Sequence, residues 1–120
     1  MKILVVDDSA NDRKHVAKLF TEAFPGCSIE AALGPREALK KCAQTKFDMI
    51  SVDGDLGCQN DYGRGDDLVR ELNGLYPELQ IVIITNDLGM NSPHVCARFD
   101  KLDSLWTYRA EAIKRLRSLI

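Results

Sequence analysis

The sequence has few of the features that mark a secreted, membrane-bound or zinc-binding protein. Its 120 residues include four cysteines, and no two of them form a C-x-x-C pair, so a zinc site or a disulfide framework has little support. The apolar run Ile3–Val6 near the amino terminus is too short for a signal peptide or a membrane span. We therefore expect a cytoplasmic protein with reduced thiols and no membrane partner.

An excess of charge of one sign is also missing. Sixteen Lys and Arg residues against 18 Asp and Glu residues give a net charge of -2, so the chain as a whole offers no electrostatic case for binding nucleic acid directly. The basic cluster Lys114, Arg115 and Arg117 is predicted to be a solvated helix face that complements the negative end of the helix dipole. With 45% hydrophobic residues, residues 1–120 are expected to form a single domain with a real core.

Strand and helix patterns alternate along the chain. Strands are expected at 2–7, 27–32, 47–53, 80–85 and 98–101. Helices are expected at 10–24, from Pro35 onward, at 66–76 and from Leu105 to the carboxyl terminus. The segment 86–97 leaves room for only a turn or two of helix. This alternation predicts an α/β fold with a doubly wound five-stranded parallel sheet and a shortened or missing fourth helix.

Polar side chains stand where four of these strands end. Asp7 and Asp8 follow the first strand, and Asp53 ends the third. Thr85 ends the fourth strand and Lys101 ends the fifth. The carboxyl ends of parallel strands share one edge of a sheet, and crowded carboxylates there favour a hard cation such as Mg²⁺. A cation, a hydroxyl and an ammonium around a nucleophilic carboxylate predict phosphoryl transfer to an aspartate.

These segments resemble, in order and on the expected elements, the signatures of response-regulator receiver domains of two-component signalling. The resemblance rests on ILVVDDS (3–9), G-x-x-E-A-L (34–39), FDMISVD (47–53), G-x-x-L-V (65–69), IVIIT (81–85) and F-x-K (99–101). It covers essentially the whole chain. It implies a flavodoxin/CheY-like (βα)5 fold and a stand-alone member of the family.

The resemblance also implies roles for the acidic residues. Asp53 would be the phosphoacceptor and one of the Mg²⁺ ligands. Asp8 would bind Mg²⁺ directly and Asp7 would bind it through water. The backbone carbonyl of Asp55, two residues past the acceptor, would supply a further metal ligand.

The remaining implied roles concern the switch and the partners. Thr85 would be the hydroxyl that moves toward the phosphoryl group, and Lys101 the charge partner of the acyl phosphate. The implied donor is a phosphohistidine on a histidine kinase or a phosphotransfer protein, and the implied target is a downstream protein. The receiver would catalyse its own phosphorylation and dephosphorylation without being a dedicated enzyme. Whether a second copy of the chain is a further partner, in a homodimer, is left open.

The sequence departs from the family pattern around the site. The segment 53–65 is longer than usual and the segment 85–101 is shorter. Asn86 follows the switch hydroxyl, where a small residue is typical, and should narrow access to the phosphoryl group. Arg98 stands where the switch aromatic is expected. These departures put the usual readout through the fourth helix and fifth strand in question.

Two consequences for packing follow from the last third of the sequence. Phe99 is one residue out of step with the expected switch aromatic, and strand alternation predicts that it faces the core. Leu102 follows Lys101 where proline is usual, so a trans peptide is expected there. Trp106 and Tyr108 are expected to serve packing rather than recognition.

Two alternatives remain beside a phosphorylated receiver. The chain could be a pseudo-receiver, an interaction module whose partner binding does not depend on phosphorylation. Separately, the D-x-D formed by Asp53 and Asp55 resembles the motif of haloacid-dehalogenase-type phosphatases. Those enzymes carry the motif on the first strand, whereas here it follows the third, so this second alternative has less support.

Overall fold

The computed structural model describes residues 1–53, 65–85 and 95–120, whose strands form one parallel sheet. The strands are β1 (Lys2–Val6), β2 (Ser28–Ala32), β3 (Met49–Val52), β4 (Gln80–Thr85) and β5 (Ala97–Asp100). Their order across the sheet is β2-β1-β3-β4-β5, and every neighbouring pair is parallel. This is the strand order of the flavodoxin-like doubly wound fold, so the predicted fold class is confirmed.

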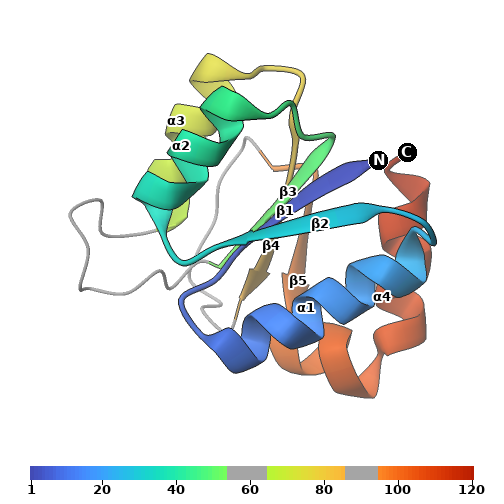
Figure 1. Ribbon diagram of the computed structural model, residues 1–120. Coiled ribbons are helices and arrows are strands. Elements are labelled where there is room, and N and C mark those ends of the chain that lie inside the picture. The colour runs from blue at the N-terminus through green and yellow to red at the C-terminus, as the bar shows by residue number, and fades with distance from the viewer. Residues whose placement is uncertain (54–64, 86–94) are drawn as a thin grey trace.

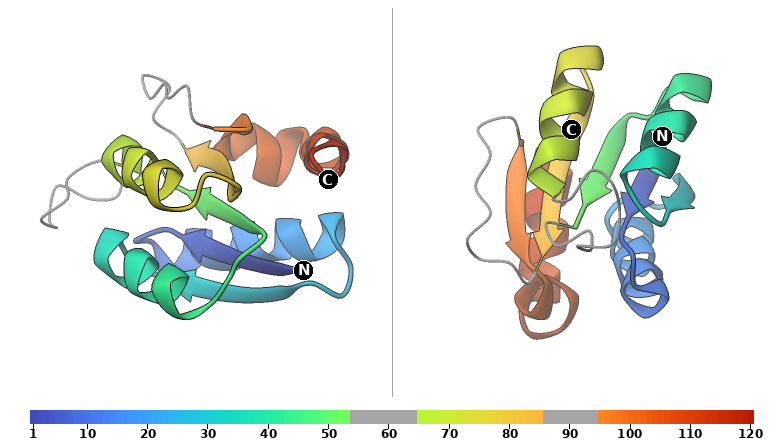
Figure 2. Two further views of the ribbon diagram at one scale, coloured as in Figure 1. Left: turned by 90° about the horizontal axis from the view of Figure 1, so that it is seen from above. Right: turned by 90° about the vertical axis from the view of Figure 1, so that its left-hand side faces the viewer.

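Helices cover both faces of the sheet, as Figures 1 and 2 show. They are α1 (Ala10–Ala23), α2 (Pro35–Gln44), α3 (Gly65–Leu75), the π-helical turn η1 (Asp103–Thr107) and α4 (Arg109–Ser118). α1, η1 and α4 pack on one face of the sheet, where Phe20 and Leu116 are buried. α2 and α3 pack on the other face through residues such as Ala38 and Leu72. The predicted short fourth helix belongs to the segment 86–97, of which 86–94 lie outside the described residues.

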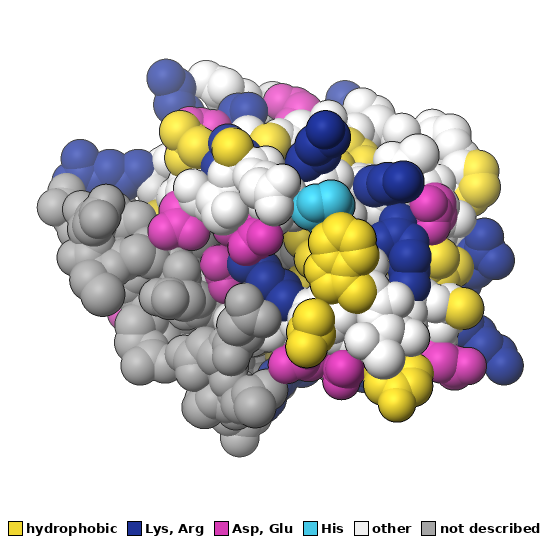
Figure 3. Space-filling model, turned by 90° about the horizontal axis from the view of Figure 1, so that it is seen from below, with side chains coloured by type: hydrophobic (Ala, Val, Ile, Leu, Met, Phe, Trp, Pro, Cys, Tyr) yellow, Lys and Arg dark blue, Asp and Glu magenta, His cyan; other side chains and the backbone are white. Residues whose placement is uncertain are grey.

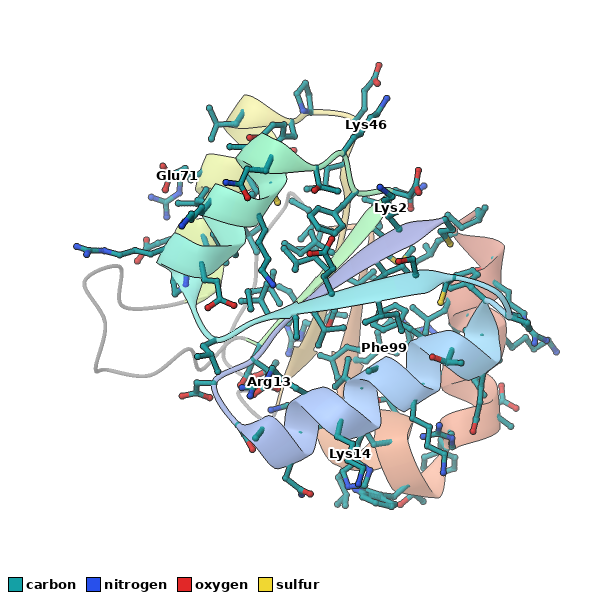
Figure 4. All side chains as sticks on the ribbon, viewed as in Figure 1. Lys2, Arg13, Lys14, Lys46, Glu71 and Phe99 are labelled. Carbon is teal, nitrogen blue, oxygen red and sulfur yellow. The ribbon has the colours of Figure 1, made fainter. Side chains whose placement is uncertain are left out.

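The burial of each strand explains its place in the sheet. β3 is buried throughout, and β1 and β4 are buried at every residue except the first. The edge strands β2 and β5 each bury a single residue, Ala32 and Phe99. Continuous apolar runs therefore take the centre, where helices cover both faces. Phe99 faces the core beside α1, as predicted (Figure 4).

Local signals explain where α1 and α2 begin and end. The Ser9 Oγ accepts a hydrogen bond from the Asp12 backbone N–H at 3.3 Å and caps α1. The helix ends before Pro25, which cannot continue it, and Gly26 follows with a positive φ of 86°. Pro35 lies in the first turn of α2, where its missing N–H leaves no hydrogen bond unmade.

The carboxyl-terminal helix differs from the prediction, because it is divided in two. In η1 the Tyr108 N–H donates to the Asp103 carbonyl at 2.6 Å, which closes a π-helical turn. Tyr108 then leaves the helical conformation (φ -122°, ψ 42°) before α4 begins. Leu105 is buried, but Trp106 and Tyr108 are each 59% exposed. The prediction of a packing role is therefore wrong for Tyr108.

Trp106 makes a ring contact on the surface. Its ring meets the ring of His15 from α1 edge to face, with the centroids 4.7 Å apart. Figure 3 shows this face, with the histidine beside hydrophobic side chains and basic residues nearby. The contact joins η1 to α1 without removing Trp106 from water.

Lys114, Arg115 and Arg117 of α4 are exposed, as predicted, but two of these three also bind the rest of the fold. Arg117 donates from Nε to the Ala23 carbonyl at 2.8 Å and from Nη2 to the Glu22 carbonyl at 3.0 Å. These carbonyls lie at the carboxyl end of α1, where backbone acceptors lack helical partners. The Arg115 guanidinium lies 4.3 Å from the centre of the Phe99 ring.

Two expectations concern thiols and membranes. Cys27, Cys42 and Cys96, the cysteines within the described residues, are free. Within the same part of the chain, no helix is both long and apolar enough to cross a bilayer. The described peptide bonds are all trans, which agrees with the expectation for the bond between Lys101 and Leu102.

Candidate metal and phosphoryl-transfer site

Two aspartates leave the sheet side by side. Val6 and Val52 are register partners in β1 and β3, so Asp7 and Asp53, which follow them, emerge at the same edge. The Asp7 N–H donates to the Ala32 carbonyl at 3.1 Å, and the Asp53 N–H donates to the Val6 carbonyl at 3.0 Å. Both aspartates are buried, with 2% and 4% of their surface exposed. The backbone ladder itself thus brings the two carboxylates together, as the sequence predicted.

Asp8 adds a third carboxylate at this edge. One oxygen each from Asp7, Asp8 and Asp53 lie within 4.8 Å of one another. Asp8 is exposed while the other two are buried, so the group opens to solvent on the side of Asp8. Three carboxylate oxygens at this spacing form a donor set for a hard divalent cation.

The ammonium of Lys101 lies among the carboxylates. Its Nζ is 2.8 Å from an oxygen of Asp7, 2.8 Å from an oxygen of Asp12 and 3.1 Å from an oxygen of Asp53. Lys101 is only 6% exposed, and a buried ammonium without partners would be costly. The three carboxylates therefore compensate the burial of this charge.

Burial and charge shift the proton equilibria of this cluster. Burial raises the pKa of the Asp7 carboxyl to about 6, the Asp53 carboxylate adds to the rise, and hydrogen bonds from Lys101 and the Ser9 N–H oppose it. For Lys101, burial acts to lower the pKa, but the hydrogen bonds to Asp12 and Asp7 and the charges of Asp53 and Asp7 outweigh it, so the pKa is raised. Lys101 therefore stays charged at neutral pH. The Asp7 carboxyl titrates closer to neutral pH than an ordinary aspartate does.

Asp12 is a member of this cluster that the sequence did not single out. It lies in the first turn of α1, where acidic residues are common because they interact favourably with the helix dipole. Its partner Lys101 is 89 positions away in the chain. No local pattern connects the two residues, so only the folded arrangement reveals the contact.

Arg13 is a second residue that the sequence did not single out. Its Nη1 donates to the Asp7 backbone carbonyl at 2.8 Å. Figure 4 shows Arg13 where α1 begins, at the carboxyl edge of the sheet. The contact ties the loop after β1 to α1 and so helps to fix the backbone that carries Asp7 and Asp8.

Over residues 3–103 the sequence matches the family model of the response regulator receiver domain. The chain belongs to this family. This receiver is similar to the response regulator TrrA of Thermotoga maritima, solved in complex with Mg²⁺-BeF, with a TM-score of 0.82 and 22% identity over 99% of this chain and 98% of that one. No curated protein sequence matches it.

Two further solved structures show the same fold. The Vibrio cholerae chemotaxis protein CheY4 has a TM-score of 0.75 to this receiver and 24% identity, over 99% of this chain and 98% of that one. The receiver domain of NtrX from Brucella abortus has a TM-score of 0.71 and 23% identity, over 93% and 98% of the two chains. The receiver fold therefore extends over essentially all of the sequence.

Of the other predicted positions, two lie within the described residues. Thr85 is the last residue of β4, the neighbour of β3, and is 1% exposed. Arg98 lies in β5 and is half-buried. Asp55 and Asn86 fall outside the described residues, so their predicted roles stay predictions. Asp53 follows the third strand of this receiver, which leaves the phosphatase alternative without support.

A separate hollow lies at the opposite edge of the sheet. It has a volume of about 720 Å³ and lies between the ends of α2 and α3, where Thr45, Phe47, Tyr76 and Leu79 line it. None of the predicted site residues belongs to it. The candidate site is therefore defined by the carboxylates and Lys101 rather than by this hollow.

Proposed function

We propose that this receiver accepts a phosphoryl group from a phosphohistidine onto Asp53 and then alters a protein–protein contact. The observation that carries the proposal is the group of Asp7, Asp8 and Asp53 oxygens within 4.8 Å, with the Lys101 ammonium 3.1 Å from Asp53. Phosphoryl transfer depends mainly on positioning and on stabilising negative charge. A nucleophilic carboxylate, a cation site and an ammonium supply these requirements.

The donor set fits Mg²⁺, which prefers carboxylate oxygens and retains several waters. Asp8 would bind it directly, Asp7 through water, and Asp53 and the Asp55 backbone carbonyl would complete the protein ligands. Bound there, Mg²⁺ would neutralise charge on the phosphoryl oxygens. That TrrA was solved with Mg²⁺-BeF supports this assignment by analogy of fold.

The chemistry requires one bond to form and one to break. An Asp53 carboxylate oxygen bonds to phosphorus as the P–N bond of the phosphohistidine breaks, and the imidazole nitrogen leaves with that electron pair and takes up a proton. Lys101 donates a hydrogen bond to a phosphoryl oxygen. In hydrolysis, a water oxygen attacks phosphorus and gives up a proton, the Asp53 carboxylate leaves, and inorganic phosphate is released.

Thr85 is the proposed link between the phosphoryl group and the surface. Its position at the end of β4, beside the strand that precedes Asp53, supports a hydroxyl contact with the phosphoryl group. Arg98 on the edge strand β5 would take the place of the usual switch aromatic. The proposed partners are a histidine kinase or phosphotransfer protein as donor and a downstream protein as target, with residues 1–120 acting as one domain.

Incubation with acetyl phosphate and Mg²⁺, followed by intact-mass measurement, tests the proposal. The wild type should gain one phosphoryl mass that is lost on alkaline or hydroxylamine treatment, whereas Asp53→Asn should gain none. Asp48→Asn is the matched control, because Asp48 precedes the same strand but is exposed at the opposite edge. Equal labelling of the wild type and Asp53→Asn would exclude Asp53 as acceptor.

A pseudo-receiver is the second candidate, and the half-buried Arg98 at the switch position favours it. In that case partner binding would be the same with and without phosphorylation. A Mg²⁺ titration separates the two functions. A dissociation constant within the range of cellular Mg²⁺ supports the phosphorylated receiver, and one far above that range supports the pseudo-receiver.

A further inference from the structure

We propose that Asp12 is a positioning residue: it holds the Lys101 ammonium before phosphorylation and competes with the phosphoryl group for it. The inference rests on the proposed function of Asp53 and adds a control on that function. It comes from the 2.8 Å contact between the Lys101 Nζ and an Asp12 oxygen. Asp12 would act through Lys101 and not on the reacting atoms.

All three donors of the Lys101 ammonium are matched by carboxylates. An ammonium has three N–H groups, and its Nζ lies 2.8, 2.8 and 3.1 Å from oxygens of Asp7, Asp12 and Asp53. A phosphoryl oxygen that binds this ammonium must therefore replace one of these contacts.

Asp12 is the partner whose release costs least. Its side chain is 32% exposed, compared with 2% for Asp7 and 5% for Asp53, so water can solvate the carboxylate once Lys101 has left it. Asp12 is also not one of the three carboxylates close enough together to share a cation. Its contact with Lys101 can thus be broken without disturbing the proposed metal ligands.

A kinetic asymmetry follows from this competition. The contact between Asp12 and Lys101 stabilises the unphosphorylated state and is lost on the way to the transition state, so it slows phosphorylation. In the acyl phosphate the contact has already been replaced, and hydrolysis begins and passes its transition state without it. Loss of the Asp12 charge should therefore accelerate phosphorylation and leave hydrolysis nearly unchanged.

The test compares wild type, Asp12→Asn and Asp12→Glu with acetyl phosphate, at a Mg²⁺ concentration that saturates each protein. In this reaction an Asp53 oxygen bonds to phosphorus and acetate leaves with the electron pair of the broken P–O bond. Asp12→Asn should be phosphorylated about two- to fivefold faster than wild type, the range expected for a partly exposed ion pair. Asp12→Glu keeps the carboxylate and should return toward the wild-type rate. The rate constants for hydrolysis of the acyl phosphate should be the same in all three proteins.

A second measurement does not depend on phosphorylation. In the absence of Mg²⁺, the Lys101 ammonium protons observed by NMR should exchange with water faster in Asp12→Asn than in wild type. Glu37→Gln is the matched control, because Glu37 is also a first-turn acid paired with a lysine, Lys41, at 3.8 Å, but it lies on α2. It should change neither the exchange nor the phosphorylation rate.

The outcomes separate this inference from the proposed function. If wild type and Asp12→Asn are both phosphorylated at equal rates, or if ammonium exchange is unchanged, the role of Asp12 is overturned and the role of Asp53 stands. Slower phosphorylation of Asp12→Asn together with lower stability would also overturn it, because Asp12 would then be structural. If the wild type takes up no phosphate at all, the proposed function fails and the competition fails with it.

Discussion

The two sides of the candidate phosphoryl-transfer site are held in place by different means. On the β1–β3 side, Asp7 and Asp53 follow buried strands and are fixed by backbone hydrogen bonds to neighbouring strands. On the β5–η1 side, Lys101 follows an edge strand that buries a single residue, and a π-helical turn comes next. Its ammonium is held by ion pairs with carboxylates of the opposite side. We call the first side rigid and the second adjustable, and an adjustable lysine would suit the proposed exchange of partners by Lys101.

The largest effect should come from removing the ammonium of Lys101. In Lys101→Met, the clustered carboxylates lose their shared partner, and breaking a buried ion pair in this way costs about 3 to 5 kcal/mol. Urea unfolding at pH 7.5 in a chelating buffer measures the loss. If ion pairs hold this side of the site, the loss should shrink at pH 5, where carboxylates accept protons in place of the ammonium.

A loss that is the same at both pH values would mean that Lys101 contributes mainly through packing. Lys114→Met is the control, because Lys114 is an exposed lysine on the same face of the fold. The free energy of unfolding of Lys114→Met should stay within about 0.5 kcal/mol of the wild-type value.

On the rigid side, Asp7→Asn should stabilise the protein when Mg²⁺ is absent. Because the pKa of Asp7 rises from its ordinary value of 3.8 to about 6 on folding, the native state binds more protons than the unfolded state between these pH values. The contribution of Asp7 to stability should therefore increase as pH falls from 7 toward 4. Asp7→Asn removes this dependence and should gain on the order of 2 kcal/mol at pH 7.

Thermal unfolding of wild type and Asp7→Asn across that pH range checks the sign. In excess Mg²⁺ the wild type should become more stable than Asp7→Asn, because it then gains binding energy that the variant lacks. A stability difference between Asp7→Asn and wild type that does not narrow as pH falls from 7 to 5 in chelating buffer would contradict the predicted sign.

A smaller effect should follow from loosening α4 on the adjustable side. Arg117→Ala removes two hydrogen bonds to the last carbonyls of α1 and should cost about 1 kcal/mol, since the side chain is exposed. Chemical denaturation measures the loss, and Arg117→Lys should recover only part of it, because an ammonium cannot reproduce the forked geometry. Phosphorylation of Asp53 should proceed at the wild-type rate in both variants.

The sequence predicted the rigid side more completely than the adjustable one. Apolar runs located β1, β3 and β4, and the aspartates that end them had to meet because parallel strands share one edge. Asp12 could not be found in this way, since its contact with Lys101 spans 89 positions and leaves no local pattern. Only tertiary contacts identify Asp12 as a member of the cluster.

The π-helical turn escaped prediction for a related reason. The spacing of Leu105, Ala112 and Leu116 suits a continuous helix, and all three are indeed buried. The π-helical turn contains one residue more than an α-helical turn, and this extra residue changes which side chains between Leu105 and Ala112 face outward. Helical periodicity in the sequence does not predict an extra residue of this kind. Tyr108, expected from the sequence to serve packing, is exposed as a result.

The smallest effect on stability should come from replacing Trp106, and this replacement tests the π-helical turn directly. Leu105 is 3% exposed and Trp106, its neighbour, is 59% exposed. Leu105→Ala should therefore cost about 2 to 4 kcal/mol through lost burial and a cavity, whereas Trp106→Ala should stay within about 0.5 kcal/mol of wild type. A continuous α-helix would orient these side chains differently. A large loss for Trp106→Ala would thus place the tryptophan in the core and remove the turn that makes the lysine side of the site adjustable.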